Sequence, residues 1–316
     1  RNKEVSEINR KQAEVPKGCL VIRNKNGTAP GMWMEKNNTV FVSMPGVPYE
    51  MQAMVTDIVI PEIKRRFKLP FIFHKTILTQ GIGESDLADL ISDWEDSLTE
   101  KEIGLAYLPS PGMVRLRLSS KGFDELELHH KIESQIEKVK PLIEKFIYGY
   151  EEYGKAQPKI EDILGQLLLE KGLKLGLAES CTGGYISHLI TSVAGSSNYY
   201  NGCIVPYHNE FKHNLLKVGN AIFEKNGAVS KECVMAMAKE TLNTFKADVA
   251  IAVSGIAGPG GGTDEKPVGT TWIAVAYGDR IVPKQFVFGH NRQRNIQMTA
   301  NTAMNMLRKL ILKIED

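Results

Sequence analysis

The chain has 316 residues, more than one ordinary hydrophobic core supports, so we expect two or three domains. Hydrophobic residues make up 42% and charged residues 24%, as in globular proteins that fold in water. The net charge of +2 argues against nucleic acid as a partner, and no apolar run is long enough to span a membrane. The four cysteines form no Cys-x-x-Cys pair, which argues against a zinc ribbon and favours a reduced, cytoplasmic setting.

The first half of the chain contains two segments and a polar stretch. Residues 1–69 show two expected strands and one helix, too little to close a core, so we expect either the back half of a larger domain or a domain that another chain completes. Residues 70–147 follow the order β-α-β-β-α, which predicts a small α+β domain with its helices on one sheet face. The polar stretch 148–157 is expected to be a linker.

The third segment, residues 158–316, alternates helical and extended patterns and predicts an α/β layered domain with a mixed sheet. The expected elements are helix 159–171, strand 173–178, a helix from Gly184, strand 203–207, helix 230–245, strand 248–254, a hairpin over 270–288 and a last helix from Arg292.

A polar, glycine-rich turn follows the strand at 173–178. It places Ser180, Thr182 and Gly183 just before a helix, where backbone N–H groups and the helix dipole favour an anion. The functional interpretation is a phosphate or carboxylate cradle. The alternative is an ordinary helix cap, because serine and threonine are common there.

A long glycine-rich loop follows the strand that ends at Ser254 and Gly255. Loops of this length inside a compact domain are usually functional, and α/β sheets bind ligands at the carboxyl ends of their strands. A mobile surface loop is the alternative interpretation.

Ser197, Tyr207 and Lys212 lie close together in the sequence and form a candidate nucleophile, relay and base. A serine needs a base to take its proton, and a lysine serves when burial lowers its pKa. A cap, a core tyrosine and a surface lysine are the alternatives. Arg292, at a helix start, opposes the helix dipole, which points either to a phosphate partner or to a plain surface arginine.

Six stretches occur in this order in residues 158–316: "AESCTGG", "AGSSNYYNGCIVPYHNEFK", "GAVS", "SGIAGPGGG", "KPVGTTWIAVA" and "FGHNR". With these motifs the chain resembles the CinA family of competence/damage-inducible proteins. Residues 158–316 resemble its C-terminal nicotinamide mononucleotide amidohydrolase domain, and 70–147 its KH-like middle domain. Residues 1–69 resemble the back half of the molybdopterin-binding-like domain, so the resemblance places the front half outside this sequence. The middle segment has "GIGES" and no Gly-x-x-Gly clamp, which argues against RNA binding.

The resemblance implies roles for single residues. Ser197 matches the family nucleophile, and Tyr207 and Lys212 match the tyrosine and lysine that follow it. Ser254, Gly255 and Arg292 match further positions of the family site, Ser254 keeping a hydroxyl where threonine is common. The implied reaction converts nicotinamide mononucleotide to nicotinic acid mononucleotide and ammonia without a cofactor.

Two other functions stay open. Some family members carry a divalent-metal-dependent ADP-ribose pyrophosphatase in the first domain, which is incomplete here. A non-catalytic nucleotide-binding module is the other alternative. The resemblance also implies a homo-oligomer, with a dimer as the expected form.

Overall fold

The computed structural model describes residues 7–12, 14–152, 154 and 157–315. The chain forms two compact units, Arg1–Phe71 and Ile72–Asp316. Across the described ranges, no helix is both long and apolar enough to cross a membrane. Within the same ranges, no group of three or more His, Cys, Asp or Glu side chains is placed to hold a metal ion.

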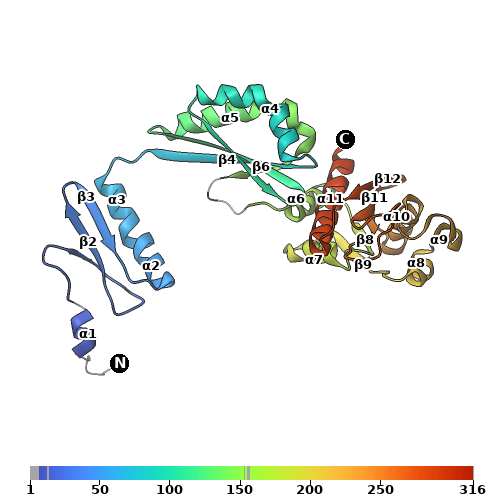
Figure 1. The fold of residues 1–316 in the computed structure, drawn as a ribbon, viewed down its shortest axis with the longest axis horizontal. Helices are drawn as coiled ribbons and strands as arrows, with labels where there is room; N and C mark the ends of the chain where they lie inside the picture. The colour runs from blue at the N-terminus through green and yellow to red at the C-terminus, as the bar shows by residue number, and fades with distance from the viewer. Residues whose placement is uncertain (1–6, 13, 153, 155–156, 316) are drawn as a thin grey trace. The chain divides into compact units, whose positions relative to one another are not determined.

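The first unit is a three-stranded antiparallel sheet, in the order β1-β2-β3, with a helical stretch against it (Figure 1). Its core is small and is built on Ile22, Trp33, Met54 and Val59. The sequence missed its central strand, β2. The elements are α1 (Glu7–Gln12), β1 (Leu20–Ile22), β2 (Gly31–Lys36), β3 (Thr39–Ser43), α2 (Pro48–Met54), the π-helical turn η1 (Val55–Val59) and α3 (Ile60–Arg66).

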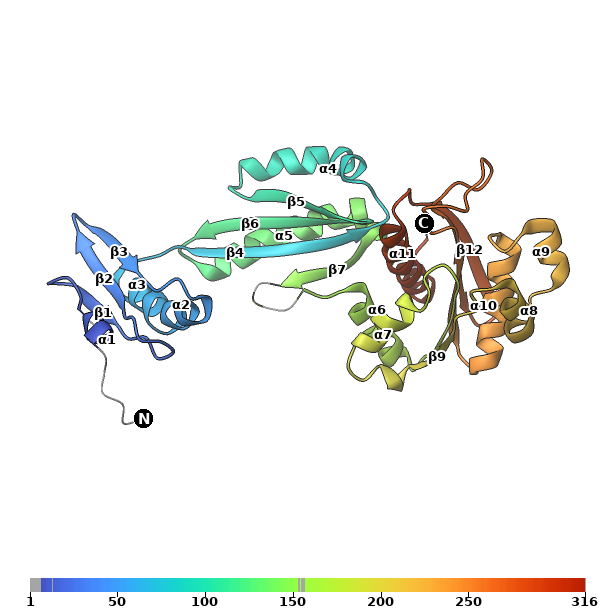
Figure 2. The same ribbon diagram turned by 60° about the horizontal axis from the view of Figure 1, so that its bottom comes forward.

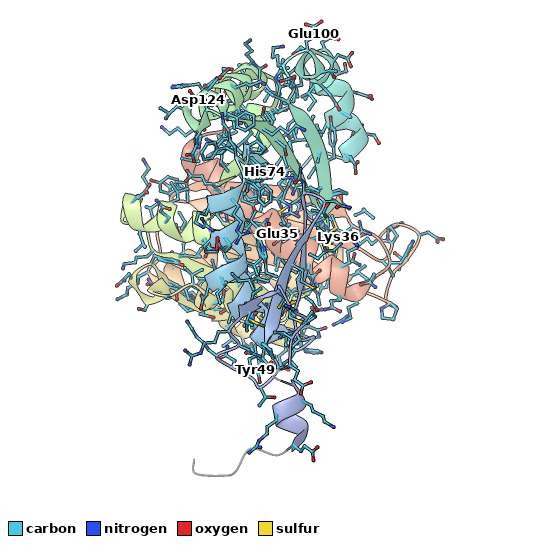
Figure 3. The ribbon with its side chains drawn as sticks, turned by 90° about the vertical axis from the view of Figure 1, so that its left-hand side faces the viewer. Glu35, Lys36, Tyr49, His74, Glu100 and Asp124 are labelled. Atoms are coloured by element: carbon cyan, nitrogen blue, oxygen red, sulfur yellow. The ribbon has the colours of Figure 1, made fainter. Side chains whose placement is uncertain are left out.

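A polar network joins the sheet of this unit to its helices. The Trp33 Nε1 donates to Glu35 Oε1 at 2.9 Å, and Arg66 pairs with the same carboxylate, labelled in Figure 3. The Arg66 guanidinium also lies 5.1 Å from the centre of the Trp33 ring. The likeness of this unit to a molybdopterin-binding-like domain stays a prediction.

The second unit begins with a four-stranded sheet, in the order β5-β6-β4-β7, whose helices α4 and α5 share one core with it (Figure 2). The expected β-α-β-β-α order is confirmed. Asp124, labelled in Figure 3, caps α5 by accepting from the Glu127 N–H at 3.1 Å. The elements are β4 (Phe71–Gln80), α4 (Glu84–Thr99), β5 (Gly104–Ser110), β6 (Met113–Gly122), α5 (Glu125–Ile143), the 3-10 turn η2 (Glu144–Phe146) and β7 (Ile147–Glu152).

Strand β7 corrects one expectation. It occupies much of the stretch 148–157 that the sequence indicated as a linker, and it pairs antiparallel with β4. Its aromatic residues have a partner to pack on: Tyr148 is buried in the same core cluster as Leu78 and Leu164. A polar composition therefore concealed an edge strand, because only one side of it faces the core.

The C-terminal part of this unit is a five-stranded mixed sheet in the order β12-β11-β10-β8-β9. Strands β8, β9 and β10 run parallel, and β11 and β12 antiparallel to them. The predicted mixed sheet is confirmed. The elements are α6 (Ile160–Lys171), β8 (Leu175–Glu179), α7 (Tyr185–Ser192), the 3-10 turn η3 (Ser196–Asn198), β9 (Tyr200–Ile204), α8 (Asn209–Leu216), α9 (Asn220–Asn226), α10 (Lys231–Phe245), β10 (Val249–Gly255), β11 (Thr270–Tyr277), β12 (Arg280–Val287) and α11 (Arg292–Leu312).

Helices cover both faces of this sheet, with α6, α7 and α11 on one face and α8, α9 and α10 on the other (Figure 2). Large side chains of β10, such as Ile251 and Val253, face α11. Its alanines, Ala250 and Ala252, face α10. Because alternate residues of a strand point to opposite faces, a run of apolar residues fills both cores.

Candidate functional site at the carboxyl edge of the mixed sheet

The parallel strands β8, β9 and β10 end at one edge of the mixed sheet, where open α/β sheets bind ligands. Ser180 follows β8, and its N–H donates to the Val253 carbonyl of β10 at 3.0 Å. Ser254 is the next residue of β10. Tyr207 follows β9, and Lys212 lies one helical turn further, on α8. Four of the residues that the sequence singled out, Ser180, Ser254, Tyr207 and Lys212, therefore meet at or near this edge.

Lys212 is a buried cation with neutral partners. Its side chain is 2% exposed. The Nζ donates to the Pro206 carbonyl at 2.9 Å and to the Tyr207 carbonyl at 3.4 Å. No carboxylate of the described residues forms an ion pair with it. Burial lowers the pKa of Lys212, while the thiols of Cys233 and Cys181 oppose that shift. A lysine in this setting is readily neutral and can accept a proton.

Arg292, the first residue of α11, ties two loops of the edge together. One guanidinium nitrogen donates to the Gly258 carbonyl at 2.8 Å and the other to the Tyr207 hydroxyl at 2.9 Å. Gly258 belongs to the glycine-rich loop after β10, and Tyr207 to the loop after β9. Tyr207 is 60% exposed, so this bridge faces solvent. The three N–H groups of the guanidinium that these bonds leave over are suited to a phosphate.

The glycine-rich turn after β8 holds a carboxylate of the protein itself. Glu179 is fully buried. Its Oε2 accepts from the N–H groups of Gly184 at 3.1 Å and Ile186 at 3.0 Å, and its Oε1 from Ser187 at 2.7 Å. These three amides are therefore occupied and do not bind a phosphate or carboxylate of a ligand. The helix end attracts an anion, as expected, but that anion is Glu179.

Other parts of this turn stay open to a ligand. The N–H of Gly183 is used by the Ser180 carbonyl, whereas those of Cys181 and Thr182 have no partner among the described residues. The buried Thr182 Oγ1 has none there either. Thr182 and Gly183 also line a cavity of about 440 Å³ that reaches Gln293, the neighbour of Arg292. Substrate binding by this turn stays a prediction, now with different donors.

Ser254 and Gly255 are held by the sheet. The Ser254 side chain is 1% exposed, and its Oγ donates to the Ala228 carbonyl at 2.8 Å. A Cβ at Gly255 would lie 2.7 Å from Thr271 Oγ1, so close packing against β11 requires glycine there. These contacts explain why serine and glycine stand at the two positions. The expected contact of both residues with substrate stays a prediction.

Ser197 does not join the other predicted catalytic residues. It lies in η3, before β9, whereas Tyr207 and Lys212 follow that strand. Next to Ser197, the Asn198 carbonyl accepts from Lys174 Nζ at 2.5 Å, and Lys174 precedes β8. Ser197 is therefore at the amino edge of the sheet. The five residues of β9 alone span about 13 Å. The prediction that Ser197, Tyr207 and Lys212 form one catalytic group is therefore wrong for residues of the same chain. Strand β9 separates Ser197 from the other two.

Ser180 and Ser254 both lie at the edge that holds Lys212. The Ser254 hydroxyl donates to the Ala228 carbonyl, whereas Ser180 is 7% exposed and its Oγ has no hydrogen-bond partner among the described residues. Its neighbour Cys181 is a poor nucleophile, because burial raises the pKa of that thiol to about 12. The charges of Lys212 and Arg292 weakly oppose this shift, so both act on this turn. The sequence does carry a signal for Ser180, because this residue directly follows a buried strand. From the sequence alone, that position is interpreted as substrate binding.

These features define an α/β-sheet protein with a buried serine and a buried, pKa-lowered lysine at the ligand-binding edge of its sheet. Comparison with known proteins gives the family. The family model of the CinA C-terminal domain matches residues 157–311, and that of the damage-inducible protein CinA KH domain matches residues 74–149. The chain belongs to the CinA family.

Two relatives illustrate the likeness. A CinA-like protein of Cytophaga hutchinsonii is 44% identical over 315 residues, which is 100% of this chain and 74% of the relative. A CinA-like protein of Flavobacterium psychrophilum is 47% identical over 98% of this chain and 73% of its own length. Among solved structures, the competence/damage inducible protein CihA from Agrobacterium tumefaciens is 35% identical, with a TM-score of 0.46, over 49% of this chain and 98% of its own.

Proposed function

We propose that this chain hydrolyses the carboxamide of nicotinamide mononucleotide to nicotinic acid mononucleotide and ammonia. The observation that carries the proposal is the burial of Lys212 between backbone carbonyls, which lowers its pKa. A neutral amine at the carboxyl edge supplies the base that a serine nucleophile needs. Membership in the CinA family supports the assignment.

In the proposed first half-reaction, neutral Lys212 takes the proton of the Ser180 hydroxyl while Ser180 Oγ attacks the carboxamide carbon. A C–O bond forms, and the carbonyl electron pair moves to oxygen. The unpaired N–H groups of Cys181 and Thr182 are candidate donors to that oxyanion. When the carbonyl reforms, the C–N bond breaks, and the Lys212 ammonium returns its proton so that ammonia leaves.

Water completes the reaction. Lys212, neutral again, takes a proton from water as its oxygen attacks the nicotinoyl ester carbon. The bond from that carbon to Ser180 Oγ then breaks, and the proton returns to the serine, which regenerates the site. Arg292 is the proposed partner of the substrate phosphate, and its bonds to Gly258 and Tyr207 hold the guanidinium in place.

The test is ammonia release from nicotinamide mononucleotide by the full chain, with and without a chelator of divalent metals. We expect release by the wild type in both conditions and none by Ser180→Ala. A folded wild type that releases no ammonia overturns the proposal. Release that stops in the chelator would instead favour metal-dependent chemistry, and the same assay with ADP-ribose then tests the pyrophosphatase alternative.

A further inference from the structure

Asn295 is a buried polar residue of α11 that the proposed mechanism does not use. It lies three residues after Arg292, so both side chains leave the same turn of the helix. Asn295 is 1% exposed, although the bridge that Arg292 forms to Tyr207 faces solvent. Because a buried amide without partners costs free energy, the hydrogen bonds of Asn295 indicate its role.

The Asn295 side chain holds two loops at once. Its Nδ2 donates to the Ala257 carbonyl at 3.0 Å and to the Gly289 carbonyl at 2.9 Å. Ala257 lies in the glycine-rich loop after β10, and Gly289 lies between β12 and α11. Nδ2 therefore contacts both loops, whereas Oδ1 has no hydrogen-bond partner among the described residues.

The two carbonyls determine which end of the Asn295 amide faces them. A carbonyl oxygen only accepts hydrogen bonds, so Oδ1 in the place of Nδ2 would meet two other oxygen atoms. An amide NH₂ group has two N–H donors, one for each carbonyl. A carboxylate has none, and a hydroxyl has only one. The contact between the two loops therefore requires the donor end of an amide.

This contact fixes the carbonyl group that receives Arg292. Gly258 follows Ala257 directly, and its carbonyl accepts from the Arg292 guanidinium at 2.8 Å. Two consecutive carbonyls of one loop are thus held by two residues of one helical turn. Gly258 has a φ of +88°, and a glycine-rich segment loses much conformational freedom when it is ordered. The Asn295 bond to the preceding residue supplies a fixed point for this segment.

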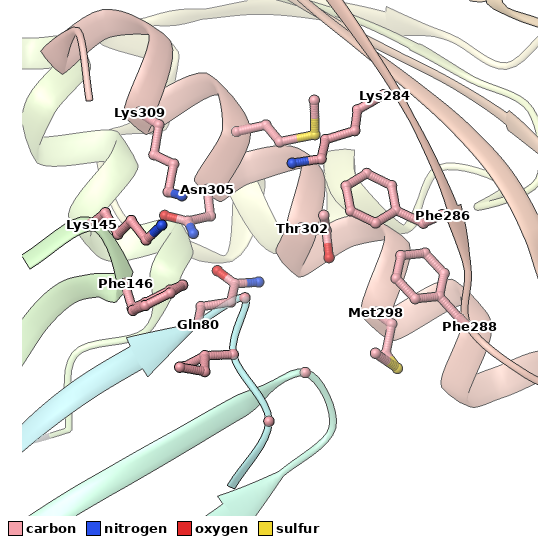
Figure 4. Close-up of a pocket in the computed structure, with 15 residues that line it drawn as sticks. Gln80, Lys145, Phe146, Lys284, Phe286, Phe288, Met298, Thr302, Asn305 and Lys309 are labelled. Atoms are coloured by element: carbon pink, nitrogen blue, oxygen red, sulfur yellow. The ribbon is translucent and has the colours of Figure 1, made fainter. Parts of the chain in front are cut away.

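A neighbouring stripe of α11 faces a separate cleft. Met298, Thr302 and Asn305 line this cleft of about 490 Å³ at the end of β4, and Figure 4 shows their side chains on its wall. Arg292 and Asn295 do not line it. Thr302 stands seven residues after Asn295, which is about 10 Å along the helix. A substitution of Thr302 therefore changes α11 without removing the Asn295 contacts.

We propose that Asn295 is a positioning residue for the substrate phosphate, because it holds the Gly258 carbonyl that orients the Arg292 guanidinium. The inference rests on the proposed function, which assigns Arg292 to that phosphate. Without the Asn295 contacts, Arg292 keeps its charge but loses a fixed acceptor. Binding of the phosphate then has to order both the loop and the arginine, which weakens it.

The test compares a substrate that carries the phosphate, nicotinamide mononucleotide, with nicotinamide riboside, which lacks it. Asn295→Leu removes the donor and keeps a side chain of similar size. We expect kcat/KM to fall about tenfold for the mononucleotide, mainly through KM, and to stay unchanged for the riboside. In an Arg292→Ala background, adding Asn295→Leu should change kcat/KM for the mononucleotide by less than about twofold, because both act on one contact.

Two control variants show whether any polar-to-apolar change on α11 has this effect. Thr299→Val removes a buried hydroxyl that donates to the Asn295 main-chain carbonyl at 2.7 Å, and Thr302→Val changes the cleft wall. Both should leave kcat/KM unchanged for both substrates. Thermal denaturation shows which variants are folded. If Asn295→Leu is unfolded, Asn295→Ser, which keeps one donor, should give a smaller effect in the same direction.

Calorimetry with ribose 5-phosphate separates this inference from the amidase proposal, because binding requires no reaction. We expect the wild type to bind ribose 5-phosphate, and Asn295→Leu to bind it about tenfold more weakly. A wild type that binds it but releases no ammonia overturns the amidase alone, and the binding comparison then decides the role of Asn295. The inference is overturned if ribose 5-phosphate does not bind, if the folded Asn295 variant binds it equally well, or if both substrates lose kcat/KM equally.

Discussion

The guanidinium of Arg292 donates a hydrogen bond of 2.9 Å to the hydroxyl of Tyr207, which lies 85 residues earlier in the chain. Because the same guanidinium binds the Gly258 carbonyl, it joins the loops that follow β9 and β10. An arginine keeps its charge in proteins, so this bridge fixes a permanent cation beside Ser180 and Lys212. A substrate phosphate would meet a preorganised partner there.

Substitution of Arg292 by lysine should raise KM for nicotinamide mononucleotide by about tenfold and change kcat less. An ammonium lacks the planar fork that reaches two acceptors at once, so the bridge and the phosphate compete for it. Steady-state kinetics check this, with Arg294→Lys as the control, since Arg294 is exposed on the same helical turn. An equal loss in the control would mean that general charge and not the bridge matters.

Replacing Tyr207 by phenylalanine distinguishes positioning from proton relay. The variant removes the acceptor of one Arg292 bond and leaves the Gly258 bond in place. We expect a modest rise in KM with kcat within about threefold, as for one hydrogen bond that is made before and during the reaction. A fall in kcat of about a hundredfold or more would support the relay that the sequence predicted.

The two candidate nucleophiles separate cleanly in paired variants. Ser180→Ala should reduce ammonia release to background, because it removes the hydroxyl at the edge that holds Lys212. Ser197→Ala should retain activity, because Ser197 lies at the amino edge of the sheet. Thermal denaturation curves of both variants show that each is folded. Activity in Ser180→Ala together with its loss in Ser197→Ala would mean that Ser197 of a second copy of the chain reaches the site.

Lys212→Met should lower kcat by about 10²–10⁴-fold, the usual loss of a general base. The free energy of unfolding should change little, because relief from burying a cation offsets the donor that the Pro206 and Tyr207 carbonyls lose. The matched control is Lys225→Met, because Lys225 is an exposed residue of α9. Chemical denaturation beside kinetics checks both parts. A variant that loses stability and activity in parallel would assign Lys212 a structural role.

The pH dependence follows from the lowered pKa of Lys212, which burial causes. The base must be neutral, so kcat/KM should rise with pH and level off below the ordinary lysine pKa of about 10.4. Between the folded and unfolded pKa values the unfolded chain binds the extra proton. The free energy of unfolding therefore rises with pH in that window. If kcat/KM of Lys212→Met still rises with pH in the same way, the titrating group is a residue other than Lys212.

Glu179→Gln should destabilise the protein by about 1.5–3 kcal/mol, because charge-assisted hydrogen bonds to three amides of α7 are lost or weakened. An amide group also turns a donor toward those N–H groups. Chemical denaturation checks the value, with Glu224→Gln on the exposed face of α9 as the control. An unchanged stability would mean that the neutral carbonyl of glutamine satisfies this helix end equally well.

The sequence predicted elements better than it predicted groups of residues. It placed strand β4, helix α5 and the final hairpin and helix of the last domain, because hydrophobic periodicity is a local property. It missed β2 and β7, whose polar or half-exposed patterns resemble loops. It also placed Ser197 beside Lys212, since closeness in sequence does not show on which side of a strand a residue lies.

What the sequence alone determined is the family, the layered α/β class, and the residue types at the end of each parallel strand. Hydrophobic patterns and ordered motifs carry that information locally. Only the tertiary structure decided which of these side chains meet. Burial of Lys212, capture of the α7 amides by Glu179, and the joining of Tyr207 to Arg292 arise where distant segments pack together. The pKa and partners of a side chain depend on that packing, so no local pattern contains them.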